Sequence, residues 1–298
     1  VAQFKALKNS LPEKLQKLEG SIHFLAWTTT PWTLPSNTAL TVGPKIDYVA
    51  VQTFNQYTFE PLVVILAEAL VGKQFGKKFF AVETAADLTT YNAGDKKIPF
   101  LVVDKYKGAE LVGSRFEQLL PFALPYQNPE NAFRVIAGDF VTTEDGTGVV
   151  HMAPGFGEDD QNECNAAGIA TVCPMDEHGQ YTAEITPWVS RHVFDANPDV
   201  IRALKEMGVV IRHDSYNHSY PHCWRCAEPL VYRAVSSWFV EVTKFRDRMV
   251  ELNDQITWSP EHIKDGSFGK WIANARDWAI SRNRFWGSPI PVWKSDDP

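Results

Sequence analysis

The stretch that most constrains the fold is an apolar run that passes into three threonines and a proline. Residues 22–26 (Ile-His-Phe-Leu-Ala) are typical of a buried strand, and residues 27–33 (Trp-Thr-Thr-Thr-Pro-Trp-Thr) follow directly. Side chains alternate along an extended backbone, so the threonines are expected to present hydroxyls on both faces. Pro31 cannot donate an N–H and should end the strand. The segment predicts either a pocket wall with fixed hydroxyls or an ordinary threonine-rich edge strand.

Composition is that of an ordinary globular protein, with 44% hydrophobic and 22% charged residues in a chain of 298. No apolar run approaches the roughly 20 residues of a membrane span, and residues 1–20 lack the apolar core of a signal peptide. Four cysteines do not make a disulfide framework in a chain of this length, so a reducing, cytoplasmic location without a membrane is expected. A chain that bound RNA mainly through phosphates would usually be basic. The net charge of −7 therefore requires a local basic face, or other parts of a larger protein, for any RNA partner.

The order of the predicted elements indicates a mixed α/β fold that is rich in strands. Residues 1–20 are interpreted as a linker or short helix, 21–190 as the core, and 191–298 as a distal part. Strands are expected at 38–42, 48–54, 62–66, 79–82, 98–103, 133–141, 149–152, 209–212 and 230–240, and helices from 158 toward 168 and at 197–207 and 261–274. Several strands, frequent turns and few long helices suggest a closed or nearly closed sheet with inserted helices.

A second polar stretch, residues 146–160, contains a histidine at a strand end and three acids at a helix start. By residue type alone His151 is an ordinary core or surface histidine. Carboxylates in a first helical turn stabilise the positive end of the helix dipole or cap free N–H groups. The other interpretation is that one carboxylate points into a pocket and binds a cation.

Three segments carry a resemblance to a known family. Residues 27–38 resemble the threonine-rich region of the editing insertion of isoleucyl-tRNA synthetases, and 146–160 are similar to the second editing signature. Residues 278–287 resemble the point where the chain re-enters the synthetase catalytic domain. Valyl and leucyl relatives usually carry Arg-Pro-Glu-Thr in place of residues 30–33, so the resemblance favours the isoleucyl branch. It implies a barrel-like editing domain with peripheral helices, inserted in a class I catalytic domain.

The resemblance also implies roles for individual residues. Asp160 follows His151 by nine positions, as the essential aspartate of the family does, and would hold the α-ammonium of the aminoacyl group. The helix start should favour its ionised form. His151 would exclude the larger amino acid by bulk rather than act as a general base. Asp159 is expected to cap the helix.

The implied reaction is hydrolysis of valine esterified to the terminal adenosine of the isoleucine tRNA. An apolar pocket gains only about 1–3 kcal/mol from one methylene, so a second site must remove valine, and isoleucyl-tRNA synthetase is itself the standard example of this limit. Water would be held by Thr28, Thr29 and Thr30 beside Trp27, with substrate-assisted proton transfer and no cofactor. There is no Gly-x-Ser-x-Gly turn and no evident Ser-His-Asp set. Expected partners are the 3′ end of mischarged tRNA(Ile) and the rest of the synthetase chain, with valyl-adenylate as a second substrate.

Two further features limit this interpretation. His218, His222, Cys223 and Cys226 include one Cys-x-x-Cys pair, but four ligands in this span are crowded for zinc, so no metal is expected. No phosphate-binding loop and neither ATP signature of the synthetase class occurs in these residues, so amino-acid activation is not expected. The alternative function is a non-catalytic RNA-binding module of a larger protein, built on residues 213–226 and 276–284.

Overall fold

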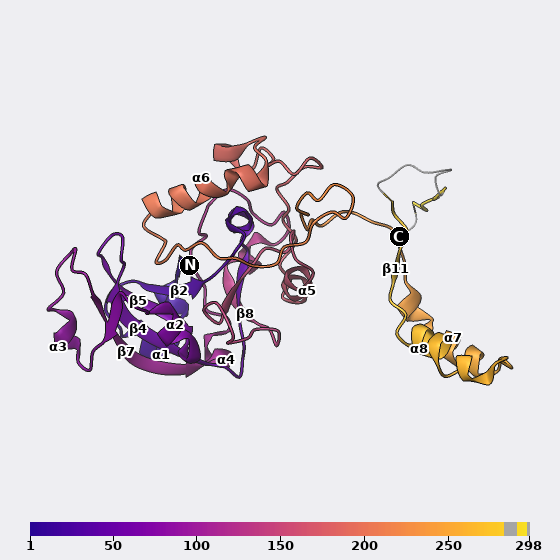
Figure 1. The fold of residues 1–298 in the computed structure, drawn as a ribbon, viewed down its shortest axis with the longest axis horizontal. Coiled ribbons are helices and arrows are strands. Elements are labelled where there is room, and N and C mark those ends of the chain that lie inside the picture. The colour runs from indigo at the N-terminus through magenta and orange to yellow at the C-terminus, as the bar shows by residue number, and fades with distance from the viewer. Residues whose placement is uncertain (283–290, 297–298) are drawn as a thin grey trace. The chain divides into compact units, whose positions relative to one another are not determined.

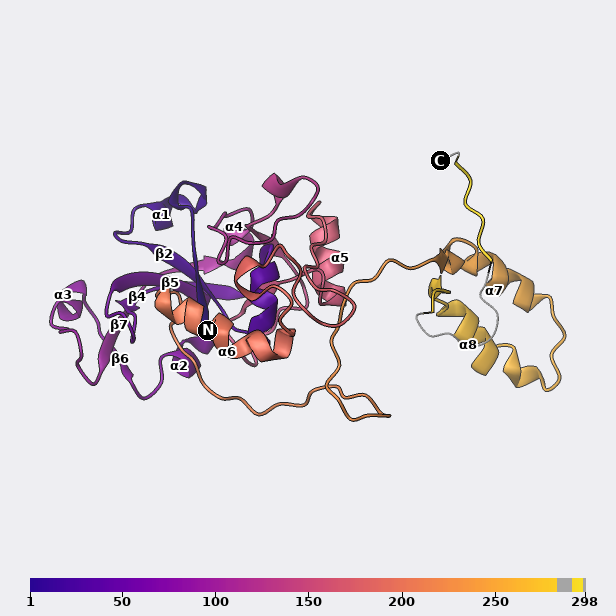
Figure 2. The ribbon, with the colours of Figure 1, turned by 90° about the horizontal axis from the view of Figure 1, so that it is seen from above.

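The computed structural model describes residues 1–282 and 291–296 and divides into two compact units, 1–234 and 235–298. Residues 278–287 resemble the point where the chain re-enters the catalytic domain, and of these, residues 283–287 lie outside the described part of the chain. Figures 1 and 2 show most strands and most helices in the first unit, which is described first. A domain boundary near residue 190 stays a prediction.

The first unit is built on a six-stranded mixed sheet in the order β1-β2-β5-β4-β7-β6. The strands are β1 (Ala2–Lys5), β2 (Ile22–Ala26), β4 (Asp47–Phe54), β5 (Pro61–Ala67), β6 (Phe79–Ala81) and β7 (Ile98–Lys107). Alternate residues of β5 pack on opposite faces, with Val63 and Ile65 in the main core and Val64 and Leu66 in a second cluster. Both faces of this strand are covered, which explains its continuous apolar run.

A smaller sheet in the order β8-β3-β9 stands beside it. Strand β3 (Ala39–Val42) runs parallel to β8 (Arg134–Ala137) and antiparallel to β9 (Val149–Met152), with Leu40 opposite His151. The pairing of β3 with β9 brings the second polar stretch next to the chain that follows the threonines.

The mixed α/β character is confirmed, but the sheets of the described residues are open rather than closed into a barrel. The segment 209–211 occupies the outer edge of β1, where Gln3 N donates to Val209 O at 2.8 Å and Ile211 N donates to Val1 O at 3.1 Å. This segment blocks the edge that would have to meet β6 to close the sheet. It makes an isolated bridge and not the predicted strand at 209–212.

Other predictions differ at element ends. Residues 1–20, expected to form a linker or short helix, contain strand β1 as well as helix α1 (Glu13–Gln16), because Phe4 is fully buried against Phe116. The strand expected at 230–240 is reduced to β10 (Phe239–Val240). The remaining helices are α2 (Val71–Gln74), α3 (Ala85–Leu88), α4 (Gly108–Leu111), α5 (Glu158–Ala166), α6 (Val193–Glu206), α7 (Arg246–Asp254) and α8 (Ser267–Ala273).

Helix α6 is the longest helix of the first unit and holds the threonine segment in place. Its buried residues Val193, Ala196, Val200 and Leu204 follow helical spacing and form one apolar face. The Asn197 side chain accepts the backbone N–H of Trp32 at 2.9 Å. This contact anchors the 3-10 turn Pro31–Ser36, which continues directly from the threonines.

The described residues of the second unit form a small helical hairpin with one short ladder. Strand β10 pairs with β11 (Trp278–Ala279), and α7 packs on α8. Asn253, near the end of α7, is buried; it donates to Lys264 O at 3.1 Å and accepts from the Trp258 indole at 2.9 Å. Among the helices of the described residues, none has the length and apolar character that crossing a membrane demands.

Candidate active site

The threonine segment leaves the sheet and folds into a hydroxyl-bearing turn. Strand β2 ends at Ala26, and the Thr28 hydroxyl accepts the Thr30 backbone N–H at 3.0 Å. The two hydroxyls lie 3.2 Å apart, and that of Thr30 lies 3.4 Å from that of Thr33. The expectation of an extended segment with hydroxyls on both faces is therefore wrong. Local side chain to backbone bonding competes with the sheet here, and Pro31 begins a 3-10 turn.

One cavity of about 400 Å³ brings together the six residues that the sequence singled out. Its wall comes from the threonine segment, the turn before β9, strand β9 itself and the start of α5. The lining includes Trp27, Thr28, Thr29, Thr30, Thr33, Thr142, Asp145, Val150, His151, Ala153, Phe156, Gly157 and Asp160. Their catalytic and binding roles stay predictions, but their convergence from distant parts of the chain is a property of the fold.

His151 is buried, and both of its ring nitrogens have protein partners. Nε2 lies 2.8 Å from Thr33 Oγ1 and Nδ1 lies 3.0 Å from Asn37 Nδ2. The Asn37 amide nitrogen also faces the carbonyl of Ala39 at 2.8 Å, which identifies this atom as the donor. Nδ1 must then accept, and the proton of the neutral ring lies on Nε2.

Burial lowers the pKa of His151 to about 4, so the imidazole is neutral at neutral pH. The Thr33 hydroxyl gives its own proton to Thr30 O at 2.9 Å and accepts from Nε2. A ring with both nitrogens engaged is suited to shaping the wall and has no nitrogen free to take a proton from water. Thr33 and Asn37 were not among the predicted site residues, although both lie within the threonine-rich motif.

Asp160 lies in the first turn of α5 with its carboxylate turned back toward β9. Oδ2 accepts the Ala153 N–H at 2.8 Å, across the loop between strand and helix. Burial is the main cause of a raised pKa for this carboxyl, opposed by the Ala153 N–H and reinforced by the charge of Asp159. The expected stabilisation of the ionised form by the helix start is thus outweighed by burial.

The remaining acids of this turn face solvent. Asp159 is exposed, and no side chain caps the helix, whose N-cap residue is Gly157. The prediction that Asp159 caps α5 is therefore wrong, because the free N–H groups of this end are not reached by that side chain. A Cβ on Gly157 would lie 2.9 Å from Asp160 Oδ1, so only glycine leaves the carboxylate where it is.

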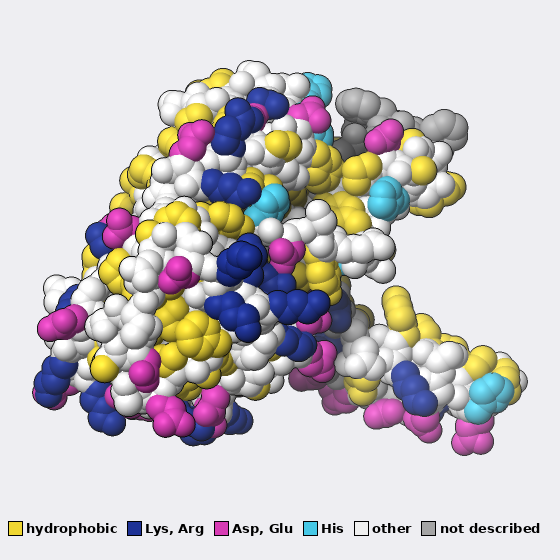
Figure 3. Space-filling view, turned by 60° about the vertical axis from the view of Figure 1, so that its left-hand side comes forward, with side chains coloured by type: hydrophobic (Ala, Val, Ile, Leu, Met, Phe, Trp, Pro, Cys, Tyr) yellow, Lys and Arg dark blue, Asp and Glu magenta, His cyan; other side chains and the backbone are white. Residues whose placement is uncertain are grey.

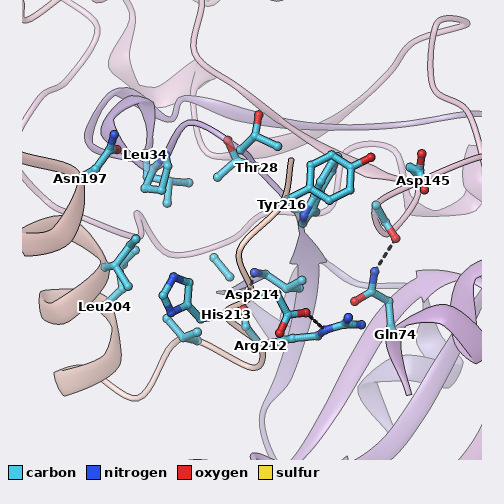
Figure 4. A pocket seen from close by; sticks show the side chains of 18 of the residues that line it. Thr28, Leu34, Gln74, Asp145, Asn197, Leu204, Arg212, His213, Asp214 and Tyr216 are labelled. Carbon is cyan, nitrogen blue, oxygen red and sulfur yellow. Dashed lines mark hydrogen bonds and ion pairs between the residues drawn. The ribbon is translucent and has the colours of Figure 1, made fainter. Parts of the chain in front are cut away.

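A second cavity of about 540 Å³ shares Trp27, Thr28, Thr29, Asp145 and Gly146 with the first (Figure 4). Its far wall is formed by α6 and by the segment that follows it, with Leu204, Arg212, His213, Asp214 and Tyr216. The rings of Trp27 and Tyr216 meet edge to face, with centroids 5.3 Å apart. The two cavities thus adjoin along the threonine wall, one polar and compact, the other larger and partly aromatic.

The histidine and cysteine loop lies in the same unit. Cys223 N donates to Glu228 O and Ala227 N to Cys223 O, both at 2.8 Å, which closes a tight turn around the Cys-x-x-Cys pair. His218 instead lines the larger cavity, and its ring stacks near Tyr216. Within residues 1–282 and 291–296, no three histidine, cysteine or acidic side chains are placed to share a metal ion.

Comparison with known proteins identifies the family of the chain. The family model of class I tRNA synthetases (I, L, M and V) matches residues 10–298. The isoleucine–tRNA ligase of Mycobacterium tuberculosis is 51% identical over 289 residues, which cover 94% of this chain and 25% of the relative. That of Cytophaga hutchinsonii is 44% identical over 331 residues, covering 100% of this chain and 28% of the relative. The chain therefore spans about a quarter of the length of these relatives.

Solved structures with a similar arrangement include "GlLeuRS-CP1", with a TM-score of 0.44 and 14% identity over 72% of this chain and 99% of that one. Another is the editing domain of the cytosolic leucyl-tRNA synthetase of P. knowlesi, with a TM-score of 0.44 and 13% identity over 70% and 94%. The family assignment depends on the match to residues 10–298. The chain belongs to the class I tRNA synthetase family that comprises the I, L, M and V members.

Proposed function

We propose that this chain is the editing domain of an isoleucine–tRNA ligase and hydrolyses the ester of valine mischarged to tRNA(Ile). The observation that supports this most strongly is the convergence of the threonine turn, His151 and Asp160 on one cavity of about 400 Å³. The identity of 51% to isoleucine–tRNA ligases supports the isoleucyl assignment.

The substrate has two parts, and two adjoining cavities could receive them. The aminoacyl group would enter the smaller cavity, where the Asp160 carboxylate would pair with the α-ammonium. The terminal adenosine would occupy the larger cavity beyond Thr28 and Thr29, beside the aromatic rings of Trp27 and Tyr216. In this pose the ester bond lies against the hydroxyls of Thr28 and Thr30, which are 3.2 Å apart.

Hydrolysis would then use a positioned water molecule. Its oxygen bonds to the ester carbonyl carbon, the carbon–oxygen bond to the ribose breaks, and the ribose oxygen leaves with a proton. The hydroxyls of the threonine turn hold the water, and a neighbouring ribose hydroxyl can carry the proton, so no covalent intermediate is required. His151 limits the side-chain space, since its nitrogens are bound to Thr33 and Asn37. Valyl-adenylate carries the same aminoacyl group and is a second substrate of this proposal.

The test is a deacylation assay of the 298-residue chain with valyl-tRNA(Ile) and isoleucyl-tRNA(Ile). The proposal expects release of valine and much slower release of isoleucine. An unchanged ester with tRNA still bound would favour the alternative, a non-catalytic RNA-binding module.

A further inference from the structure

A group of cationic side chains borders the larger cavity, although the whole chain is acidic. We define the cationic cluster as Lys73, Lys78, Lys205 and Arg212. Lys73 and Arg212 line the cavity. Lys78 and Lys205 are exposed; Lys205 contacts the lining residue His213, and Lys78 contacts Gln56, which bonds to residue 211 beside the lining. Figure 3 shows lysine and arginine side chains gathered on one face of the molecule.

The cluster is held together by the segment 211–213. Arg212 Nη1 donates to Lys73 O at 2.8 Å. Lys205 Nζ lies 3.2 Å from His213 Nδ1. Lys78 Nζ donates to Gln56 Oε1 at 3.1 Å, and the Gln56 amide donates to Ile211 O. These contacts join segments that are distant in sequence beside one cavity.

Two acidic side chains form ion pairs with the cationic cluster, but they do not cancel its positive charge. Lys73 pairs with Asp145 at 3.3 Å, and Arg212 pairs with Asp214. Neither of these two ion pairs involves Lys78 or Lys205. Both paired carboxylates are more than half exposed, and exposed ion pairs contribute little free energy, so phosphate could replace them at small cost. Burial and the Lys205 ammonium lower the pKa of His213, in keeping with a positive local potential.

We propose that the cationic cluster binds the phosphodiester backbone of a single-stranded RNA end whose terminal nucleoside occupies the larger cavity. The inference rests on the proposed function, which puts adenosine in that cavity. Because Lys73 and Arg212 line this cavity, the phosphates preceding a nucleoside seated there would come within reach of the cluster. Such contacts fix the register of the RNA without reading its sequence. The cationic cluster would be the local basic face that RNA binding requires in a chain with a net charge of −7.

The test compares the wild-type chain with the double variant Lys78→Gln/Lys205→Gln. Glutamine keeps a polar side chain while removing the charge. The matched control is Lys14→Gln/Lys17→Gln, at and just after α1, which Figure 2 shows on the other side of β4 and β5 from α2. Binding of a fluorescent single-stranded RNA ending in CCA is measured by anisotropy across a salt series, and hydrolysis is measured with valyl-tRNA and with phosphate-free valyl-adenosine.

The cluster variant should bind the RNA on the order of tenfold more weakly at 0.1 M salt. The slope of log K against log salt should fall in magnitude by about 1.4, since each lost contact to a single strand removes about 0.7. The control should match wild type. Loss of hydrolysis should be greater for valyl-tRNA than for valyl-adenosine.

Two results would overturn the proposal. One is an unchanged affinity and salt slope in the cluster variant. The other is an equal loss with valyl-tRNA and valyl-adenosine, which would indicate a disturbed cavity rather than lost phosphate contacts. If wild type hydrolyses neither ester, the proposed function fails, while the RNA titration still decides whether the cluster binds the backbone.

Discussion

The Nε2 atom of His151 lies 2.8 Å from the hydroxyl of Thr33, which links strand β9 to the threonine motif inside the cavity wall. With Asn37 on the other ring nitrogen at 3.0 Å, the imidazole is fixed in one orientation and one tautomer. The ring is thereby held as a fixed part of the cavity wall.

Replacing His151 with alanine should therefore relax selectivity rather than abolish hydrolysis. The space opened should let isoleucyl-tRNA be deacylated while valyl-tRNA hydrolysis persists. Because a methylene-sized difference is worth about 1–3 kcal/mol, the preference for valine should fall by roughly tenfold to two-hundredfold. Parallel deacylation of both substrates measures this, and selective loss of valyl-tRNA hydrolysis would show that His151 is catalytic.

The Thr33 hydroxyl should matter for stability as well. Thr33→Val keeps the shape of the side chain but leaves the buried Nε2–H without its acceptor, at a cost of about 1–3 kcal/mol in the free energy of unfolding. Thr29→Val is the matched control, since the Thr29 side chain is exposed, and it should change stability by less than about 0.5 kcal/mol. Urea titrations compare the two, and equal values would mean that the His151–Thr33 bond carries no net stabilisation.

The buried histidine also predicts acid sensitivity. The pKa of His151 is about 4 in the folded protein and 6.5 in the unfolded chain. Between pH 4 and pH 6.5, therefore, the unfolded chain binds a proton at His151 that the folded protein does not. Stability is therefore present above pH 6.5 and is lost as pH falls toward 4. Between pH 7 and 5 wild type should lose about 2 kcal/mol more than His151→Gln. Denaturant titrations at pH 7 and pH 5 measure the free energy of unfolding of both proteins. An equal loss in wild type and His151→Gln would contradict the burial of His151.

Gly157 is expected to position Asp160. A Cβ there would lie 2.9 Å from Oδ1 and 3.0 Å from Cγ, and the extended φ of −151° accepts alanine without strain. Gly157→Ala should thus displace the carboxylate and slow valyl-tRNA hydrolysis on the order of a hundredfold, the effect of a displacement of about 1 Å. The control is Gly76→Ala, where a Cβ meets nothing within 4 Å. A Gly157→Ala enzyme as fast as this control would refute the positioning role.

Local pattern in the sequence predicted the elements that have a clear period or start signal. The strand before Trp27 and the helix beginning at Glu158 are confirmed in the structure. The closed sheet was wrong because closure depends on which segment reaches the edge of β1, and residues 209–211 do so from a distant part of the chain. Local periodicity in the sequence does not predict pairing between segments that lie far apart in the chain.

Some features of the candidate site could likewise be predicted from the sequence, and others could not. Its six residues could be selected from two motifs, and the fold places them around one cavity. Asn37 was missed because an asparagine after Pro-Ser suggests a turn, whereas here its amide bonds to a ring 114 positions away. The raised pKa of Asp160 was missed because burial is set by the tertiary fold and outweighs the effect of the helix start.

In the proposed function, the Asp160 carboxylate binds the α-ammonium of the aminoacyl group. Asp159 offers the matched control one residue away, since it carries the same charge on the same turn but is exposed. Its loss should cost at most about 1 kcal/mol of stability, as the removal of a charge at a helix start does. In the proposed complex, loss of Asp160 would leave the buried ammonium unpaired, at about 3–5 kcal/mol.

The most direct measurement is the rate of valyl-tRNA(Ile) deacylation by Asp160→Ala and Asp159→Ala, beside their melting temperatures. Asp160→Ala should be slower than wild type by on the order of a hundredfold to a few thousandfold. Asp159→Ala should stay close to wild type in rate, and both variants should remain folded. Loss of hydrolysis in Asp159→Ala with a full rate in Asp160→Ala would contradict the assignment of this carboxylate.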